Sequence, residues 1–487
     1  MDNLNQPAMS SLSARRRFLT HGMGGAGAFA LSQLIGREGG ASPQGAAAFP
    51  AKAKACIYIY LEGGPSQMDL FDPKPMLNER DGQPLPDSFT ENVQFAFLQK
   101  ETATVMGSPR RFAPAGQCGM EMSDLLPHLA TCADDIALIR SMHTDQFNHV
   151  PAQLLMNTGS ELAGRPSVGS WLSYGLGSET ENLPAFVTLI TTGRGIPGGT
   201  ASWSSGFLPS SHSGVLFGNG EDAILNLKNP RGVSAGIQKE SIEAINDFNR
   251  MRFERMRDPE LDSRIEAYEL AFRMQSKAPE LIDLSDESAH TLAAYGVNRD
   301  EPPIKRNLGG IGKYQEFSRN CLMARRLVER GVRVVNIIHS SWDHHSNLDA
   351  QLTHNSGMVD QPIAALLKDL KQRGLLDETL VVWASEFGRT SLGENRNGKK
   401  SKVTGRDHHP GAFSMWMAGG GVPGGQVIGA TDEFAWKVTD NPVHVHDLHA
   451  TQLKLFGLDH QQLTYRYLGR DFRLTDVHGR VVNELVG

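Results

Sequence analysis

The chain has 487 residues, of which 39% are hydrophobic and 21% charged, a composition typical of a globular protein with a large core. Its formal net charge is −6, whereas nucleic-acid-binding proteins usually carry an excess of basic residues. We therefore expect the partner to be a small molecule or a polymer other than a nucleic acid. The four cysteines have no Cys-x-x-Cys spacing, which argues against a thiolate zinc cluster and against a disulfide scaffold.

An arginine-rich motif near the N-terminus predicts export. Arg15–Leu19 (Arg-Arg-Arg-Phe-Leu) precedes a Gly/Ala-rich stretch, residues 20–36, that is too short and too weakly apolar for a stable membrane span. The motif resembles a twin-arginine export signal, and the alternative is a basic cytosolic tail. We expect residues 1–53 to be signal and linker, and the mature protein to be periplasmic or extracellular.

The first predicted strand, residues 55–61, is a continuous apolar run of the kind that is buried on both faces of a parallel sheet. It is followed by Glu62 and by Gly63 and Gly64, which allow a tight turn with the backbone close to a ligand. Glu62 therefore lies at the carboxyl end of a central strand, where it is either a site residue or a cap for the glycine turn.

A second strand, residues 134–141, leads through Asn148 and His149 into a helix over residues 152–158. Because free N–H groups at a helix start attract anions, side chains at this position face any anionic ligand. A further helix begins at Ser167, whose hydroxyl is either a substitute nucleophile or simply the helix cap.

The rest of the chain contains both predicted strands and predicted helices. After a strand at 186–190, residues 192–330 form Gly/Ser/Pro-rich loop and charged helices, which we interpret as a surface insertion over or beside the site. The last third predicts strands at 332–338, 379–385 and 412–418 and helices at 357–373 and 445–456. This alternation indicates an α/β sheet with covering helices.

Three of these strands adjoin motifs rich in metal ligands. Ser341–Asn347 (SWDHHSN) follows one strand, Glu386–Arg389 (EFGR) follows the next, and Gly405–Gly411 (GRDHHPG) precedes the third. Because open α/β sheets gather their sites at the carboxyl ends of the strands, we expect these motifs to converge on a divalent metal ion. Another histidine-rich run, His444–His449, opens a predicted helix, and a surface helix start is its simplest interpretation.

The resemblance to a known family is carried by four motifs: Gly63–Pro75, Glu386–Arg389, Gly405–Pro410 and Gly469–Asp476. They resemble the DUF1501 family over nearly all of the chain after the signal, and the order of the elements resembles the alkaline phosphatase superfamily, which includes sulfatases. The resemblance implies an α/β, alkaline phosphatase-like fold, with a largely parallel sheet and helices on both faces. It implies one such domain over residues 54–487, with the loop and helical insertion around 192–330.

The resemblance also assigns a first metal site. Enzymes of the superfamily hold one ion with an Asp and a His after a central strand and with a later His. The corresponding residues here are Asp343, His344 or His345, and His409. Nitrogen and oxygen ligands suit Zn, Mn or Ca, and the choice among these ions stays open.

The acids of a second metal site correspond to Glu62 and Glu386. Phe387 stands where that site has another ligand, so we expect one ion rather than two. Glu386 has the alternative of a structural ion pair with Arg389. If Glu386 acts at the site instead, Glu386→Gln should lower metal content without lowering the melting temperature.

The nucleophile of sulfatases corresponds to His149, which can act as a nucleophile, as a general acid or base, or as a further ligand. Arg389 is suited to holding two oxygens of an anionic substrate. We assign Asn148, Ser167 and His408 to substrate binding.

These assignments predict an exported, metal-dependent hydrolase of phosphate or sulfate esters that acts on a small molecule or a glycan. The alternative is an exported binding or scaffold protein that has lost catalysis on the same fold. Phe387 and the missing Ser, Thr or Cys nucleophile favour this alternative. An isomerase or phosphomutase is disfavoured because those enzymes act on cytosolic metabolites. No oligomeric state is predicted.

Overall fold

The computed structural model describes residues 48–90, 95–191, 197–218, 232–256, 259–302, 314–394 and 404–487. The predicted twin-arginine motif and most of its linker, residues 1–47, lie outside the described residues. Within the described ranges, no helix has the length and apolar character needed to cross a membrane.

Nine strands in the described part of the chain form one central sheet in the order β13-β5-β12-β9-β1-β8-β6-β7, with β16 also paired to β5. β1 pairs in parallel with both β8 and β9, and β6 and β7 continue the parallel run, whereas β12 is antiparallel to both of its neighbours. The predicted α/β fold with a largely parallel sheet is therefore confirmed, with strand 55–61 between 332–338 and 379–385. The strands are β1 (Ala55–Leu61), β5 (Ile136–His143), β6 (Phe186–Thr191), β7 (Val215–Phe217), β8 (Val334–His339), β9 (Thr379–Ala384), β12 (Phe413–Ala418), β13 (Gln426–Ile428) and β16 (Val443–His444).

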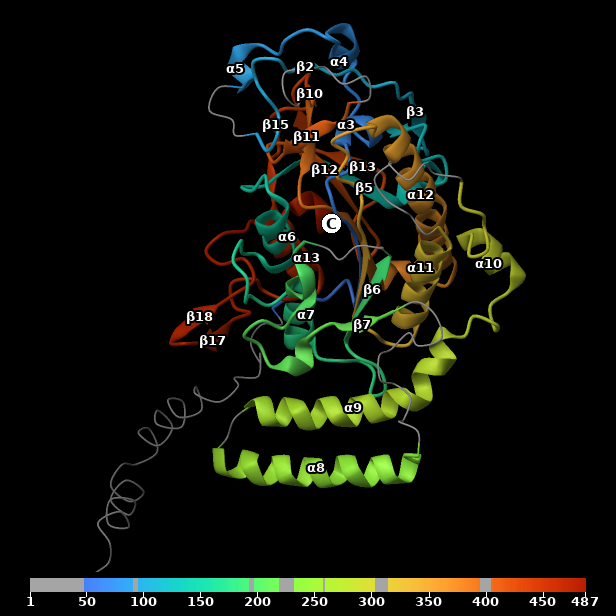
Figure 1. Cartoon of the computed structure of the whole chain (residues 1–487), viewed down its shortest axis with the longest axis vertical. Coiled ribbons are helices and arrows are strands. Elements are labelled where there is room, and N and C mark those ends of the chain that lie inside the picture. Colours follow the sequence, from blue (N-terminus) through green and yellow to red (C-terminus); the bar gives the residue numbers. More distant parts are fainter. Residues whose placement is uncertain are drawn as a thin grey trace, which may run out of the picture.

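Helices cover both faces of this sheet (Figure 1). The side chains of β1 alternate between two apolar cores: Ile57 and Ile59 belong to one core, whereas Tyr58 and Tyr60 belong to the other. Burial on both faces explains why this strand is apolar at every position. The helices of the first core include α11 (Tyr314–Glu329) and α12 (Leu348–Gln372), and those of the second include α6 (His149–Thr158), α7 (Val168–Leu176) and α13 (Val445–Leu455).

Part of the predicted insertion belongs to the sheet. β7 pairs with β6 as an edge strand, and α11 packs on the sheet with Phe317 and Leu327 fully buried. The charged stretch forms α8 (Ala235–Met256) and α9 (Pro259–Ile282), two long helices that lie side by side at one end of the molecule (Figure 1). Because β7 and α11 bury apolar side chains in the core, the segment outside the sheet is narrower than residues 192–330.

A small antiparallel sheet follows the carboxyl end of β9, formed by β2 (Thr104–Val105), β10 (Gly388–Gly393) and β11 (Arg406–His409). Arg389 lies opposite His408 in this pairing. The sequence predicted loops here, whereas the strand pairing holds two of the ligand-rich motifs side by side. The other elements include α3 (Gln67–Leu70), α4 (Pro75–Glu79), α5 (Asp87–Thr90), α10 (Ala289–Tyr295), β3 (Phe112–Ala115), β4 (Met120–Ser123), β14 (Ala430–Thr431), β15 (Val438–Asp440), β17 (Tyr465–Tyr467) and β18 (Arg470–Phe472).

Candidate metal centre

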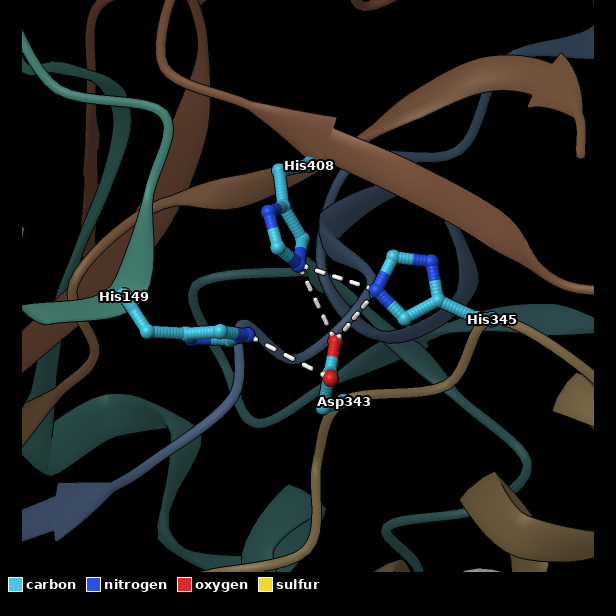
Figure 2. Close-up of side chains that lie close together, drawn as sticks. All are labelled: His149, Asp343, His345 and His408. Carbon is cyan, nitrogen blue, oxygen red and sulfur yellow. Dashed lines mark hydrogen bonds and ion pairs between the residues drawn. The ribbon is translucent and has the colours of Figure 1, made fainter. Parts of the chain in front are cut away.

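Four side chains converge at the carboxyl edge of the central sheet (Figure 2). His149 begins α6, Asp343 and His345 lie in the loop after β8, and His408 lies on β11. Oδ1 of Asp343 is 2.8 Å from His345 Nε2 and 3.1 Å from His408 Nε2, and Oδ2 is 3.3 Å from His149 Nε2. The Nε2 atoms of His345 and His408 are 3.0 Å apart. We call these four residues the His/Asp cluster.

The spacing of these atoms fits a divalent ion. Ligand atoms about 2.0–2.1 Å from a tetrahedral ion lie roughly 3.3 Å from one another. The separations in the His/Asp cluster, between 2.8 and 3.3 Å, are close to this value. His149 Nε2 is also buried without a hydrogen bond of acceptable geometry in the described part of the molecule. A cation at the centre of the cluster would accept the lone pair of this nitrogen and those of the Nε2 atoms of His345 and His408.

All three imidazoles are held at their other ring nitrogen, Nδ1. An acceptor at Nδ1 fixes a proton there and leaves the lone pair of Nε2 directed at the centre, which is how metal-bound histidines are usually oriented. The acceptors are Glu386 Oε1 for His149 at 2.8 Å, the Phe147 carbonyl oxygen for His408 at 2.8 Å, and Glu394 Oε2 for His345.

The charges of the cluster favour a cation as well. Burial would raise the pKa of Asp343, but Arg389 and the three histidines hold that pKa well below its ordinary value. Burial would lower the pKa of His149, but its contacts with Asp343 and Glu386 raise it to about 10. The pKa of His408 falls to about 4, chiefly through burial. A proton on His149 therefore occupies the place of a cation, and an arriving ion would displace it.

Glu62 and Glu386, the predicted acids of a second metal site, approach each other beside His149. The side-chain amide of Gln153 donates to Glu62 Oε1 and to Glu386 Oε1, at 3.2 Å each. Burial and the charge of Glu386 raise the pKa of Glu62 to about 7. Burial would also raise the pKa of Glu386, but its contact with His149 holds that pKa below the ordinary value.

Arg389 does not have the predicted substrate-binding geometry. Its side chain is fully buried, and Nε donates to the carbonyl of Gly64 at 2.8 Å. One terminal nitrogen donates to the Arg406 carbonyl at 3.0 Å, and the other contacts Asp343 Oδ1 at 2.7 Å. The N–H donors of Arg389 are thus used by backbone carbonyls and by the carboxylate of Asp343. Arg389 therefore positions Asp343 and does not bind two oxygens of a substrate.

Two predicted ligands, His344 and His409, lie outside the His/Asp cluster. His344 Nε2 is 3.0 Å from the Ser341 carbonyl, and His409 Nε2 is 2.6 Å from the Trp436 carbonyl. Successive side chains of a strand point to opposite faces, so on β11 only one of the adjacent histidines reaches the centre. That residue is His408, for which the sequence predicts a role in substrate binding, and not the predicted ligand His409.

Asn148 and Ser167, the other two predicted substrate-binding residues, lie at the starts of two helices. Asn148 is exposed at the position before α6, and its side chain does not cap the helix. Ser167 is buried at the start of α7, where its hydroxyl accepts a hydrogen bond from the N–H of Ser170 at 3.3 Å. Ser167 is therefore a helix cap, which was the simpler of its two interpretations.

Sequence reasoning missed three residues that orient the cluster: Gln153, Glu394 and Asp407. Asp407 is fully buried and its Oδ1 accepts the backbone N–H of His408 at 2.9 Å. The only local signal was an acid directly before the histidine pair. Glu394 directly follows β10 and belongs to no motif, so its contact with His345 depends on a fold that brings residues distant in sequence together.

The fold and the His/Asp cluster define an α/β protein with a candidate metal centre at the carboxyl edge of its sheet. The chain belongs to the DUF1501 family, described as proteins of unknown function, whose sequence model matches residues 53–486. A search of curated proteins finds no match.

Solved structures similar to this chain include three hydrolases. The PsFucS1 sulfatase from Pseudoalteromonas sp. is 12% identical over 83% of this chain and 68% of its own, with a TM-score of 0.33. The phosphonate monoester hydrolase SpPMH from Silicibacter pomeroyi is 11% identical over 83% and 74%, with a TM-score of 0.32. A mutant of the TAB5 alkaline phosphatase with Mg bound is 12% identical over 76% and 92%, with a TM-score of 0.29.

Proposed function

We propose that the protein is an exported, metal-dependent hydrolase of phosphate or sulfate esters. The observation that carries this proposal is the His/Asp cluster, in which three Nε2 atoms and a carboxylate converge while every Nδ1 is held by an acceptor. A divalent ion there, when bound, supplies polarisation of an ester oxygen and acidifies water. The twin-arginine-like motif Arg15–Leu19 supports export.

The donor set narrows the choice of ion. Three imidazole nitrogens and one carboxylate suit zinc or manganese, whereas calcium takes six to eight oxygen ligands. We therefore favour zinc or manganese at the His/Asp cluster over calcium. Glu62 and Glu386 support the cluster instead of forming a second complete site, because Gln153 bridges them and His149 contacts Glu386.

The start of α6 supports binding of an ester anion beside the cluster. The first backbone hydrogen bond of the helix runs from Ala152 to Asn148, and Pro151 has no N–H. The N–H groups of His149 and Val150 therefore precede the helical ladder, where they and the helix dipole favour an anion. An ester held there would have its phosphorus or sulfur next to the cluster.

Attack by water is the simplest course of this reaction. Water adds to phosphorus or sulfur, the bond to the ester oxygen breaks, and the departing alcohol takes up a proton. A covalent route would need a protein nucleophile, and the Ser385 hydroxyl near Glu386 is committed to the backbone: it donates to the Leu61 carbonyl at 2.8 Å and accepts from the Gly64 N–H at 3.1 Å. In the proposal, His149 is a ligand and not the nucleophile.

A second function is favoured by one feature of the site. The four residues of the His/Asp cluster would complete a tetrahedral coordination sphere, as in structural zinc sites, whereas catalytic sites keep one position open. The protein would then be an exported binding or scaffold protein with a stabilising ion.

The two functions are separated by one experiment on the purified full-length protein. Metal analysis would be combined with a panel of aryl phosphate monoesters, diesters and sulfates, for the wild type and for His345→Ala. Hydrolysis that is present in the wild type and lost with the ion in His345→Ala supports the hydrolase. Bound metal without turnover of any ester supports the binding protein, and absence of bound metal contradicts both.

A further inference from the structure

An exposed phenyl ring stands over the His/Asp cluster. Phe97 exposes 53% of its surface, yet its ring centroid lies 5.1 Å from that of His345 and 6.2 Å from that of His408. A second phenyl, Phe387, is fully buried, with its centroid 4.5 Å from His408 and 5.0 Å from His149. The cluster is thus flanked by one buried ring and by one ring that reaches solvent.

Phe97 is held in this place by the backbone around it. Its N–H and that of Leu98 donate to the same oxygen of Asp407, Oδ2, at 2.9 and 3.0 Å. The other oxygen of Asp407 accepts the N–H of the cluster residue His408 at 2.9 Å. Leu98 is buried in an apolar group that includes Trp436. One fully buried carboxylate therefore ties the segment that carries Phe97 to the strand that carries a ligand.

A large apolar side chain kept exposed and fixed beside a candidate reaction centre is suited to contacting a ligand. We propose that Phe97 receives the non-reacting part of the substrate, and that the substrate is an ester of a group with a flat apolar face, as an aromatic or sugar ring has. This inference rests on the proposed ester hydrolysis at the His/Asp cluster. To that proposal it adds the chemical class of the alcohol that hydrolysis releases, which is an alcohol with an aromatic or sugar ring.

Steady-state kinetics of the metal-loaded full-length protein test the inference. The substrates are phenyl phosphate, glucose phosphate and ethyl phosphate, with the corresponding sulfates. Phe97→Ala should raise KM about tenfold for the phenyl and glucose esters, change kcat less than about twofold and leave the ethyl esters unaffected. Phe97→Trp should restore the KM. An equal change for ethyl and ring esters, or no change, would overturn the inference.

Phe248→Ala is the matched control. Phe248 is also an exposed phenylalanine, at 69%, but it lies on α8 at the far end of the molecule from α6 (Figure 1). Its removal should change neither KM nor metal content. Metal content should also stay unchanged in Phe97→Ala, because Phe97 supplies no ligand atom.

Binding separates this inference from the proposed hydrolysis. If the wild type turns over none of the esters, calorimetry with phenyl phosphate and ethyl phosphate still measures the contribution of Phe97. The wild type should bind phenyl phosphate about tenfold more tightly than ethyl phosphate, and Phe97→Ala should bind both equally. Equal affinities in the wild type, or no binding of either, would overturn the role of Phe97.

Discussion

His408 and His409 are adjacent residues of β11 whose rings have different surroundings: His408 faces Asp343, and His409 contacts the Trp436 carbonyl. His408→Ala should lower the affinity for Zn²⁺ by more than about 100-fold, because loss of an outer partner alone costs about 10–100-fold. His409→Gln keeps a donor for the carbonyl and should retain full metal content. Dialysis followed by metal analysis compares the two, and equal losses would contradict the ligand role of His408.

Glu386 gives a second prediction at this scale. Its buried carboxylate accepts hydrogen bonds from the Tyr60 hydroxyl at 3.0 Å and from the Gly63 N–H at 2.9 Å. An amide would replace one of these two oxygens by an NH2 group that faces a donor, so Glu386→Gln should lower the free energy of unfolding by about 1–3 kcal/mol. It should also lower metal affinity by about 10–100-fold. The loss of stability replaces the expectation from sequence that the melting temperature would not fall.

Glu62→Gln is the control for this variant. Because the pKa of Glu62 is raised to about 7 by burial and by the charge of Glu386, a neutral amide there removes repulsion. Its free energy of unfolding should equal that of the wild type or exceed it. Urea denaturation measures both variants, and a Glu386→Gln protein as stable as Glu62→Gln would show that the Glu386 hydrogen bonds contribute little.

The sequence identified the motifs of the site and left the choice between His344 and His345 open, but in the second pair it favoured His409 where the structure brings His408 to the cluster. Asp343 and both histidine pairs were recognisable as candidate ligands after or before buried strands. Choosing His408 over His409 requires the register of β10 against β11, which depends on contacts between distant residues. The residue type of Arg389 favours a role in binding an anionic substrate, but the burial that commits its donors to backbone carbonyls is a property of the fold.

At the scale of the elements, the turn after β1 determines where the loop after β8 can lie. Gly63 has a φ of +120°, and a Cβ there would lie 2.3 Å from the backbone nitrogen of Asp343. Gly63→Ala should therefore displace Asp343, lowering both metal content and the free energy of unfolding, the latter by more than about 2 kcal/mol. Thermal denaturation and metal analysis measure these effects.

The helical residue Gly236 serves as a control for the Gly63 substitution. Among the described residues, a Cβ at Gly236 would have only the Ser234 hydroxyl nearby, at 3.8 Å. Gly236→Ala should stabilise α8 by about 0.5–1 kcal/mol and leave the ion in place. If Gly63→Ala behaved in the same way, the close approach of the two loops would not constrain Asp343.

The long apolar elements were predictable, and the short polar ones were not. β1, β8 and β9 are continuous apolar runs, and burial on both faces of a parallel sheet gives this pattern directly. β10 and β11 are short and contain Arg, Asp and His, so nothing in their local pattern indicates a strand. Their sheet forms because the chain leaves β9 at the edge of the central sheet where the site lies. There, pairing between β10 and β11 gives their backbone N–H and C=O groups hydrogen-bond partners.

At the scale of the whole molecule, a bound ion would join α6, the loop after β8 and β11, which are far apart in sequence. Because binding to the folded state stabilises it, Zn²⁺ at 100 times its Kd should add about 2.7 kcal/mol. Treatment with a chelator should lower the melting temperature by several degrees, and added Zn²⁺ should restore it. Calorimetry with His408→Ala as the control measures this shift, which that variant should lack.

The most direct test of the metal centre is anomalous diffraction from crystals of the purified protein, recorded at the absorption edge of the metal found by elemental analysis. We expect one strong peak about 2.0–2.2 Å from Nε2 of His149, His345 and His408 and from a carboxylate oxygen of Asp343. No peak at this position in metal-loaded crystals, or an ion bound by His344 or His409 instead, would contradict this expectation.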